Sequence, residues 1–318
     1  MTIFRRAIRW FFFLAGFVVG IATTIAFVMS RRMISPPRQS LWATPDELGL
    51  LYETVQFPAQ DGVRLSGWFV PAPADSRRKG GTVVLVHGWP WNRLGDTAED
   101  LLSNLMGSTP VDMLRLLFHL HQEGFNVLTF DLRNHGQSAS APPVGFGLEE
   151  SKDLLGALAY LKGRPDVNPD RIGAVGFSMG ANALLYTLTK SDQIGAAVAV
   201  QPTSAPVFAQ RLGADLFGPL GQLIVPLAEL FYRLAGGVAF NSIWPKTAVS
   251  RAYPIPVLYI QGQGDPWGSV ADVNEIAAAT VNAHGPLLVD TSHRYGGYQY
   301  AVDNPKIIAA FFEEHLPE

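Results

Sequence analysis

One pentapeptide of the sequence has the composition of a catalytic turn. Gly176-Phe177-Ser178-Met179-Gly180 lies between an apolar run typical of a buried strand and a run typical of a helix. A sharp strand-to-helix turn strains the backbone of its central serine and exposes the hydroxyl, and flanking glycines remove the Cβ clashes that such a turn creates. The start of the following helix also stabilises negative charge. The pattern predicts that Ser178 is a nucleophile in acyl transfer.

A serine nucleophile needs a base, and the base needs an acid that orients it. His293 lies just after the last predicted strand, in a loop from which it can reach Ser178. Asp265 follows the preceding predicted strand, which gives the chain order Ser, Asp, His. Asp290 is the alternative acid, directly after the last strand but close to His293 in sequence. We expect Ser178, His293 and Asp265 to form a catalytic triad.

A tetrahedral intermediate also needs donors for its oxyanion. His87-Gly88-Trp89 ends a predicted strand, so the backbone N–H groups of Trp89 and Met179 are the expected donors. We expect His87 to fix its own loop by a hydrogen bond rather than to act as a base. The remaining histidines are expected on helices or at the far end of the sheet: His119, His121, His284 and His315.

These residues all fall at the carboxyl ends of predicted strands, where open α/β sheets place their functional loops. Apolar β-rich runs alternate with helical stretches, which predicts a mostly parallel sheet with helices on both faces. The first two runs flank Gln60-Asp61-Gly62 and predict an antiparallel hairpin at the edge. The expected strands are 54–57, 63–70, 82–86, 126–130, 172–177, 196–200, 256–260 and 286–289, and the expected helices are 98–122, 148–162, 181–189, 270–281 and 305–315.

An insertion interrupts this alternation at about 201–253. It is apolar, rich in glycine and proline, and spaced for short helices. Because it begins near the predicted nucleophile, we interpret it as a cap that accepts apolar acyl groups or touches lipid. The alternative is an extra helical layer that only covers the core.

Composition excludes several classes of function. Of 318 residues, 48% are hydrophobic and 16% are charged, and the formal net charge of −3 argues against a nucleic-acid partner. The absence of cysteine excludes disulfides, thiolate metal sites and a cysteine nucleophile. No phosphate-binding loop or metal-ligand spacing stands out, so we expect no cofactor and no metal.

The apolar excess lies at the N-terminus. Residues 10–29 carry no charge, and twenty helical residues rise about 30 Å, the thickness of the hydrocarbon core. Arginines flank this span on both sides, and no small-residue cleavage site follows it, which favours an uncleaved anchor (1–34) over a signal peptide. The arginine counts lean towards a cytoplasmic N-terminus with the catalytic domain outside. Residues 35–50 are expected to tether a domain that covers 51–318.

The motifs together resemble the α/β-hydrolase superfamily, in its serine-hydrolase branch of esterases and lipases. The matching pieces are His87-Gly88-Trp89, Asp131 to Ser138, Gly176 to Gly180, Gly264-Asp265 and Ser292-His293. The resemblance implies a Ser178 nucleophile, a His293 base, an Asp265 orienter and an acyl-enzyme that water cleaves. The sequence departs from the family where Pro266-Trp267-Gly268 follows Asp265. His87-Gly88-Trp89-Pro90 is also similar to epoxide hydrolases, whose nucleophile is an aspartate where this chain has Ser178.

We therefore expect a membrane-anchored hydrolase of carboxylic esters or thioesters, with an apolar acyl part and the bilayer as a partner. An amidase or peptidase of the same fold is one alternative. A non-catalytic binding protein that keeps the fold is another.

Overall fold

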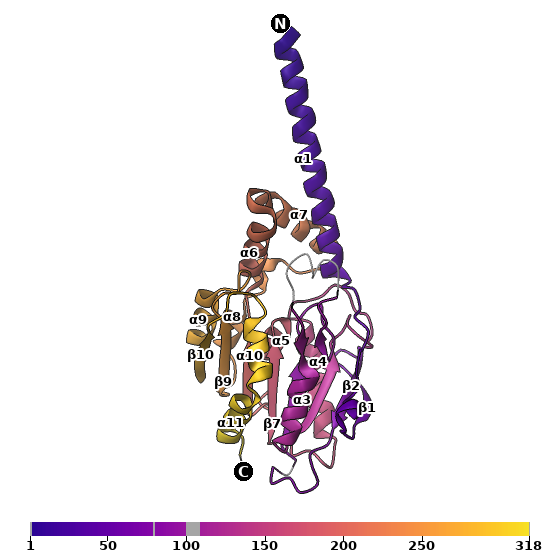
Figure 1. Ribbon diagram of the computed structural model, residues 1–318, viewed down its shortest axis with the longest axis vertical. Coiled ribbons are helices and arrows are strands. Elements are labelled where there is room, and N and C mark those ends of the chain that lie inside the picture. Colours follow the sequence, from indigo (N-terminus) through magenta and orange to yellow (C-terminus); the bar gives the residue numbers. More distant parts are fainter. Residues whose placement is uncertain (1, 79, 100–108, 318) are drawn as a thin grey trace.

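The computed structural model describes residues 2–78, 80–99 and 109–317, and its centre is a mostly parallel sheet (Figure 1). The strand order is β1-β2-β6-β3-β7-β8-β9-β10. β1 and β2 are antiparallel to their neighbours, and the pairs from β6 to β10 are all parallel. The bounds are β1 Glu53–Pro58, β2 Arg64–Val70, β3 Thr82–Val86, β6 Asn126–Asp131, β7 Ile172–Phe177, β8 Ala196–Val200, β9 Val257–Gly262 and β10 Ala283–Val289. This confirms the predicted parallel sheet with an antiparallel hairpin at its edge.

Helices cover both faces of the sheet, as the alternating pattern predicts. Apolar side chains of α4 (Glu150–Lys162), α5 (Met179–Thr187) and α9 (Val270–Ala279) pack into one buried cluster with the sheet. Those of α3 (Met113–Gln122), α10 (Gly296–Asp303) and α11 (Pro305–His315) pack into a second cluster. The strands β3, β7 and β8 are buried along their whole length because they have helices on both sides.

The helix predicted over 98–122 is confirmed from residue 113 on, and the described residues just before it are not helical. Helix α3 begins only at Met113, where the Asp112 side chain caps it by accepting a hydrogen bond from the Arg115 amide (3.1 Å). Before it, β4 (Gly95–Asp96) and β5 (Val111–Asp112) form a small antiparallel pair, and residues 100–108 lie outside the described part. The helix α10 lies in a segment for which no helix was predicted, because it begins with two glycines.

The insertion between β8 and β9 consists of short helices. These are α6 (Ala205–Phe217), a 3-10 turn (Gly218–Leu220), α7 (Gly221–Leu234), a second turn (Phe240–Ser242) and α8 (Pro245–Val249). Gly218 has a φ of +52°, a left-handed conformation that separates α6 from α7. In Figure 1, α6 and α7 lie at the end of the sheet where the long N-terminal helix meets the domain.

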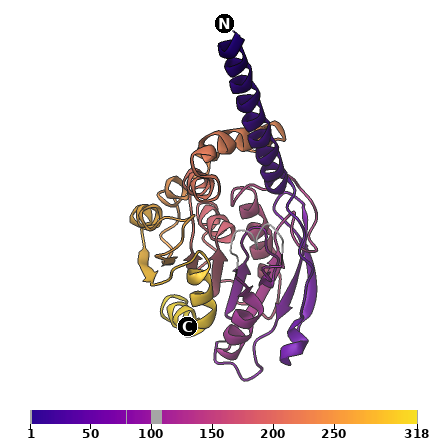
Figure 2. The same ribbon diagram turned by 45° about the horizontal axis from the view of Figure 1, so that its top comes forward.

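That N-terminal helix, α1 (Thr2–Ile34), extends far beyond the domain, and only its last turns touch it (Figures 1 and 2). At 1.5 Å per residue its 33 residues measure about 50 Å. Within the described residues, two segments have the length and hydropathy that a membrane span needs: Phe4–Ile34 and Ala205–Leu234. The second combines α6 and α7, each of which rises only about 20 Å.

The segment after α1 is fixed to the domain. The Arg38 guanidinium donates hydrogen bonds to the backbone carbonyls of His135 (3.0 Å), Gly136 (2.6 Å) and Ser138 (2.7 Å), and to the Ser140 hydroxyl (2.8 Å). Asn92 donates to the carbonyls of Gln39 and Ser40. A short 3-10 turn, η1 (Pro45–Leu48), then leads into β1.

Candidate active site

Ser178 lies at the junction of β7 and α5, in the strained turn that the pentapeptide predicts. Its φ of 51° and ψ of −114° are rare for a residue with a side chain. The turn tolerates only glycine on either side: a Cβ at Gly176 would lie 2.5 Å from the Gly180 carbonyl oxygen, and one at Gly180 would clash with the carbonyl oxygen of Val86. The Ser178 amide donates to the Val200 carbonyl (2.9 Å), which fixes the turn to the next strand.

The loop after β3 lies directly against Ser178. A Cβ built on Gly88 would stand 3.3 Å from the Ser178 Cβ, so glycine lets the two segments approach closely. The backbone amides of Trp89 and Met179 donate no hydrogen bond to any other described residue. Both residues line the same cavity as Ser178. The two amides are therefore available to an oxygen atom of a ligand at Ser178.

His87 has the structural role that the sequence predicts. The Leu132 amide donates to its Nε2 (3.0 Å), so Nδ1 carries the proton and donates to the Gly88 carbonyl (2.7 Å). The ring is fully buried, and burial lowers the pKa of His87 to about 4. This histidine is neutral at pH 7 and holds the loop that carries Trp89.

Asp265 is buried at the carboxyl end of β9, with 4% of its surface exposed. Its carboxylate accepts hydrogen bonds from the Trp267 amide (3.0 Å) and from the Gln201 side chain (2.9 Å). The Pro266-Trp267-Gly268 sequence that departs from the family pattern thus supplies a donor to the acid, and Gly268 leaves room for its Oδ2. Asp290, the alternative acid, is exposed.

Arg294, not His293, connects Asp265 to Ser178. Its Nη1 lies 3.2 and 3.1 Å from the two Asp265 oxygens, and its Nη2 donates to the Ser178 hydroxyl at 3.4 Å. The His293 ring makes no hydrogen bond to Ser178 or Asp265, and its Nδ1 is buried without a partner among the described residues. The structure thus connects Ser178 and Asp265 through Arg294, and it does not bring the His293 ring into hydrogen-bond contact with either residue.

Aromatic rings enclose the Arg294 guanidinium. Its central carbon lies 5.1 Å from the ring centroids of Phe208 and Trp267 and 5.6 Å from that of Tyr298. Burial acts to lower the pKa of Arg294, but Tyr298 and the Asp265 carboxylate raise it above its ordinary value. The guanidinium therefore keeps its proton and cannot accept one from Ser178.

Sequence reasoning missed Arg294 and Gln201. Gln201 is buried with a φ of +48°, and its amide nitrogen donates to both Asp265 and the Arg294 carbonyl (2.9 Å each). A signal existed for Gln201, because it directly follows β8, just as Ser178 directly follows β7. Arg294 carried no such signal, because its neighbour His293 matches the expected chemistry.

A cavity of about 480 Å³ opens at Ser178. Its walls are mainly apolar and come from the loop after β3, from α6 and α7, and from the last turns of α1. Residues from these four places are Trp89, Leu212, Val225 and Met29. The volume falls in the range of about 300–1,000 Å³ that small-molecule sites occupy. The insertion thus lies over Ser178 as a cap would.

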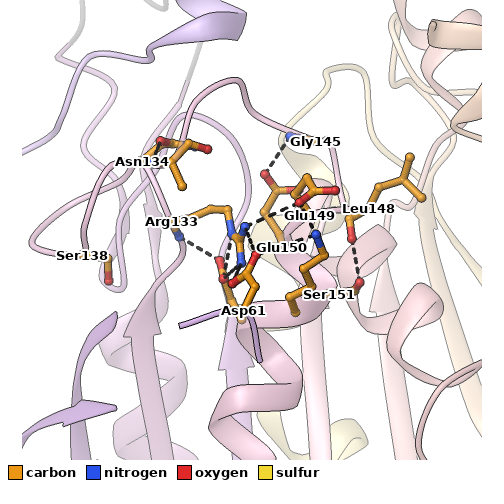
Figure 3. A network of polar contacts seen from close by, with 12 residues as sticks. Asp61, Arg133, Asn134, Ser138, Gly145, Leu148, Glu149, Glu150 and Ser151 are labelled. Atoms are coloured by element: carbon orange, nitrogen blue, oxygen red, sulfur yellow. Dashed lines mark hydrogen bonds and ion pairs between the residues drawn. The ribbon is translucent and has the colours of Figure 1, made fainter. Parts of the chain in front are cut away.

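A buried ion network holds the loop that follows β6 (Figure 3). Arg133 pairs with Asp153 (2.7 Å) and Asp61 (2.8 Å), and its amide also donates to Asp153. Glu150 accepts from the amides of Gly145 (2.8 Å) and Gly147 (2.7 Å) on the segment that leads back to α4. These contacts explain the Asp131 to Ser138 motif as scaffolding beside the cavity.

In the part of the chain that the structure describes, no group of three or more histidine, aspartate or glutamate residues is arranged to hold a metal ion.

The fold and the site define an α/β hydrolase. The family model described as the alpha/beta hydrolase family matches residues 83–311, and the chain belongs to this family. Residues 83–311 include Ser178, Asp265 and His293.

Among known proteins, the uncharacterized protein YfhR of Escherichia coli K12 is 26% identical over 221 residues. The alignment covers 68% of this chain and 64% of YfhR, so the chain spans just under two thirds of that relative. The thiohydrolase apmlB of Arthrinium phaeospermum is 28% identical over 159 residues, which cover 49% of this chain and 45% of that protein.

Among solved structures, the Pyrococcus furiosus esterase Pf2001 superposes with a TM-score of 0.66 at 25% identity. The superposition covers 89% of this chain and all of the esterase.

Proposed function

We propose that this chain is a serine hydrolase, anchored to a membrane by α1, that cleaves a carboxylic ester or thioester with an apolar acyl group. The observation that carries the proposal is the strained turn at Ser178, which presents a hydroxyl to an apolar cavity. Strain of this kind persists where the surrounding structure imposes it, and it is typical of catalytic sites. The similar proteins include an esterase and a thiohydrolase, which supports the same class of reaction.

In the proposed reaction the Ser178 hydroxyl attacks the carbonyl carbon and forms a tetrahedral intermediate. The amides of Trp89 and Met179 donate to its oxyanion, as their free N–H groups allow. His293 takes the serine proton and returns it to the leaving alcohol or thiol, while Asp265 orients the imidazolium. Water then attacks the acyl-enzyme by the same route and releases the acid.

This reaction requires His293 to take the position between Ser178 and Asp265 that Arg294 holds. The two residues are neighbours in the loop between β10 and α10, so a change in that loop can exchange them. Arg294 cannot be the base, because a guanidinium beside a carboxylate stays protonated. In this proposal the observed arrangement is the resting state of the enzyme, in which Ser178 has a hydrogen-bond donor beside it and no base.

The contacts of Arg294 with Asp265 and Ser178 also favour a second candidate function, a binding protein that keeps the fold. With Arg294 permanently at Asp265, Ser178 has no base, and the cavity binds an apolar ligand without turnover.

Fluorophosphonate labelling of the full-length protein in detergent distinguishes the two candidates. We expect labelling of the wild type, none of Ser178→Ala, and wild-type labelling of Ser250→Ala, whose serine is exposed at the end of α8. A p-nitrophenyl ester series then measures turnover, with matched anilides for the amidase alternative. A folded wild-type protein that neither labels nor turns over would establish the binding protein instead.

A further inference from the structure

The wall of the cavity includes part of the helix that serves as the proposed anchor. Thr24, Ile25, Val28 and Met29 of α1 line the same cavity as Ser178. The opposite wall consists of cap residues such as Leu212 and Leu216 of α6. A helix that only tethered the domain would have no reason to border the space above the nucleophile.

Close packing fixes α1 in this place. Ala22 and Ala26 of α1 are buried against Ile224 and Ala228 of α7, and small residues at such a contact let two helices approach closely. Next to this contact, the rings of Phe27 of α1 and Phe231 of α7 meet edge to face, with their centroids 5.8 Å apart. Figures 1 and 2 both show α7 beside the lower end of α1.

The loop that contains Val144 also holds α1 and α7 together. The Val144 amide donates to the Met33 carbonyl at the end of α1 (3.1 Å), and the Tyr232 hydroxyl of α7 donates to the Val144 carbonyl (2.5 Å). Val144 thereby connects both helices to the catalytic domain.

The charges on α1 set its depth in a bilayer. Arg9 and Arg31 border the uncharged stretch, which spans about 30 Å, so the hydrocarbon core extends almost to Arg31. Ile25, Val28 and Met29 then lie at the depth of the acyl chains in the leaflet nearer the domain. Because α7 packs on Ala22 and Ala26, it lies at the same depth.

The exposed surface of the cap agrees with this depth. Leu220 in the turn before α7 and Leu223, Leu230 and Leu234 on α7 are exposed, Leu234 to 75%. Four exposed leucines on one short segment are costly in water and favourable among acyl chains. The part of the cavity wall that α1 forms therefore lies at the depth of the acyl chains.

We propose that the substrate is a membrane-resident lipid ester, and that an acyl chain of this lipid passes sideways from the bilayer between α1 and α6 into the cavity. The inference rests on the proposed function and deepens it. In this arrangement α1 is both the anchor and a wall of the acyl site. Ser178 then meets the ester group at the level where the lipid's polar part leaves the hydrocarbon.

To test the proposal, a larger side chain on α1 is used to narrow the path of the acyl chain. Ile25→Trp places a large ring at the cavity, whereas Ile21→Trp places the same ring one turn away on an exposed position that does not line it. With full-length protein in liposomes, we expect Ile25→Trp to lower kcat/KM for a long-chain monoacylglycerol about tenfold or more relative to Ile21→Trp, and to lower kcat/KM for p-nitrophenyl acetate by a smaller factor. Equal rates for Ile25→Trp and Ile21→Trp on the long-chain substrate would overturn the proposal.

A binding measurement separates this inference from the proposed reaction. Ser178→Ala protein in liposomes is irradiated with a monoacylglycerol that carries a diazirine at the end of its chain, and the adducts are mapped by mass spectrometry. We expect adducts at Leu212, which is buried on the cavity wall, and their loss in the added Ile25→Trp variant but not with Ile21→Trp. Adducts confined to the exposed residues 11–19 of α1 would refute lateral entry, even if the enzyme hydrolyses esters. Adducts at Leu212 without any turnover by the wild type would support entry and refute the hydrolase.

Discussion

The guanidinium of Arg294 lies 3.1 Å from the carboxylate of Asp265 and 3.4 Å from the hydroxyl of Ser178. It thereby fills the place that a triad histidine needs. The pair is largely hidden from water, and Gln201 and Trp267 complete the hydrogen bonds of the acid. This contact determines whether Ser178 has access to a base.

If Arg294 competes with His293 for the position beside Asp265, replacing His293 should lower the reactivity of Ser178 and replacing Arg294 should raise it. We expect His293→Gln to lower kcat by about 10²–10⁴-fold, the usual contribution of a general base. We expect Arg294→Met to label with fluorophosphonate faster than the wild type, because the histidine meets less competition for Asp265. Arg251→Met, which changes an exposed arginine, is the control. Slower labelling of a folded Arg294→Met protein would show that the arginine supports the nucleophile.

The two candidate acids predict different losses. Asp265→Asn should reduce kcat by about 10⁴-fold, because an amide no longer stabilises the imidazolium or selects its tautomer. Asp290→Asn should change kcat little, because that carboxylate is exposed. Ester turnover of the two variants side by side decides the assignment, and a larger loss in Asp290→Asn would reverse it.

The glycines of the nucleophile turn have a steric role that can be measured. Gly180→Ala forces a methyl group against the Val86 carbonyl and should destabilise the protein by about 1–3 kcal/mol with loss of labelling. Gly163→Ala is the matched control: its nearest atom is 3.5 Å away and its φ is −82°, so we expect unchanged or slightly higher stability. Denaturant unfolding in detergent measures both, and equal midpoints for the two variants would contradict the steric argument.

Buried neutral histidines predict a loss of stability in acid. The folded pKa of His87 is lowered to about 4 and that of His135 to about 3, both through burial, against 6.5 for a free histidine. Below pH 6.5 the unfolded chain binds more protons than the folded one, so the free energy of unfolding falls as the pH falls towards 4. The loss should be on the order of 2 kcal/mol per histidine between pH 7.5 and 5.

Denaturant titrations at the two pH values measure this loss, and His87→Gln should reduce its size. A His87→Gln variant with the wild-type pH dependence would show that this ring does not cause it.

Sequence patterns predicted the central strands well because these strands are short apolar runs that are buried on both faces. Runs such as Thr82–Val86 and Ile172–Phe177 match the structure at both ends. The helix predicted over 98–122 differs from the structure just before Met113, because the Asp112 side chain caps α3 there. Local patterns predict whether a segment is a helix or a strand. The end of a helix is harder to predict where one capping side chain determines it.

The candidate site likewise has features that sequence position predicts and one feature that it does not. The turn at Ser178 and the burial of Asp265 follow from position relative to strands, and sequence contains that information. Which of two adjacent residues, His293 or Arg294, meets the acid depends on side-chain packing against Phe208 and Trp267. Phe208 comes from the insertion, far away in the chain, so no local pattern reports it.

Arg38 restricts the motion of the domain relative to α1. Its four hydrogen bonds to residues 135–140 make the connection between α1 and the domain rigid rather than flexible. With α1 in a bilayer, the domain keeps one face towards the lipid and cannot tumble to search the surrounding solution. Enzyme and substrate then meet by lateral diffusion in a plane. Turnover should follow the mole fraction of substrate in the lipid and be indifferent to the volume of buffer around it.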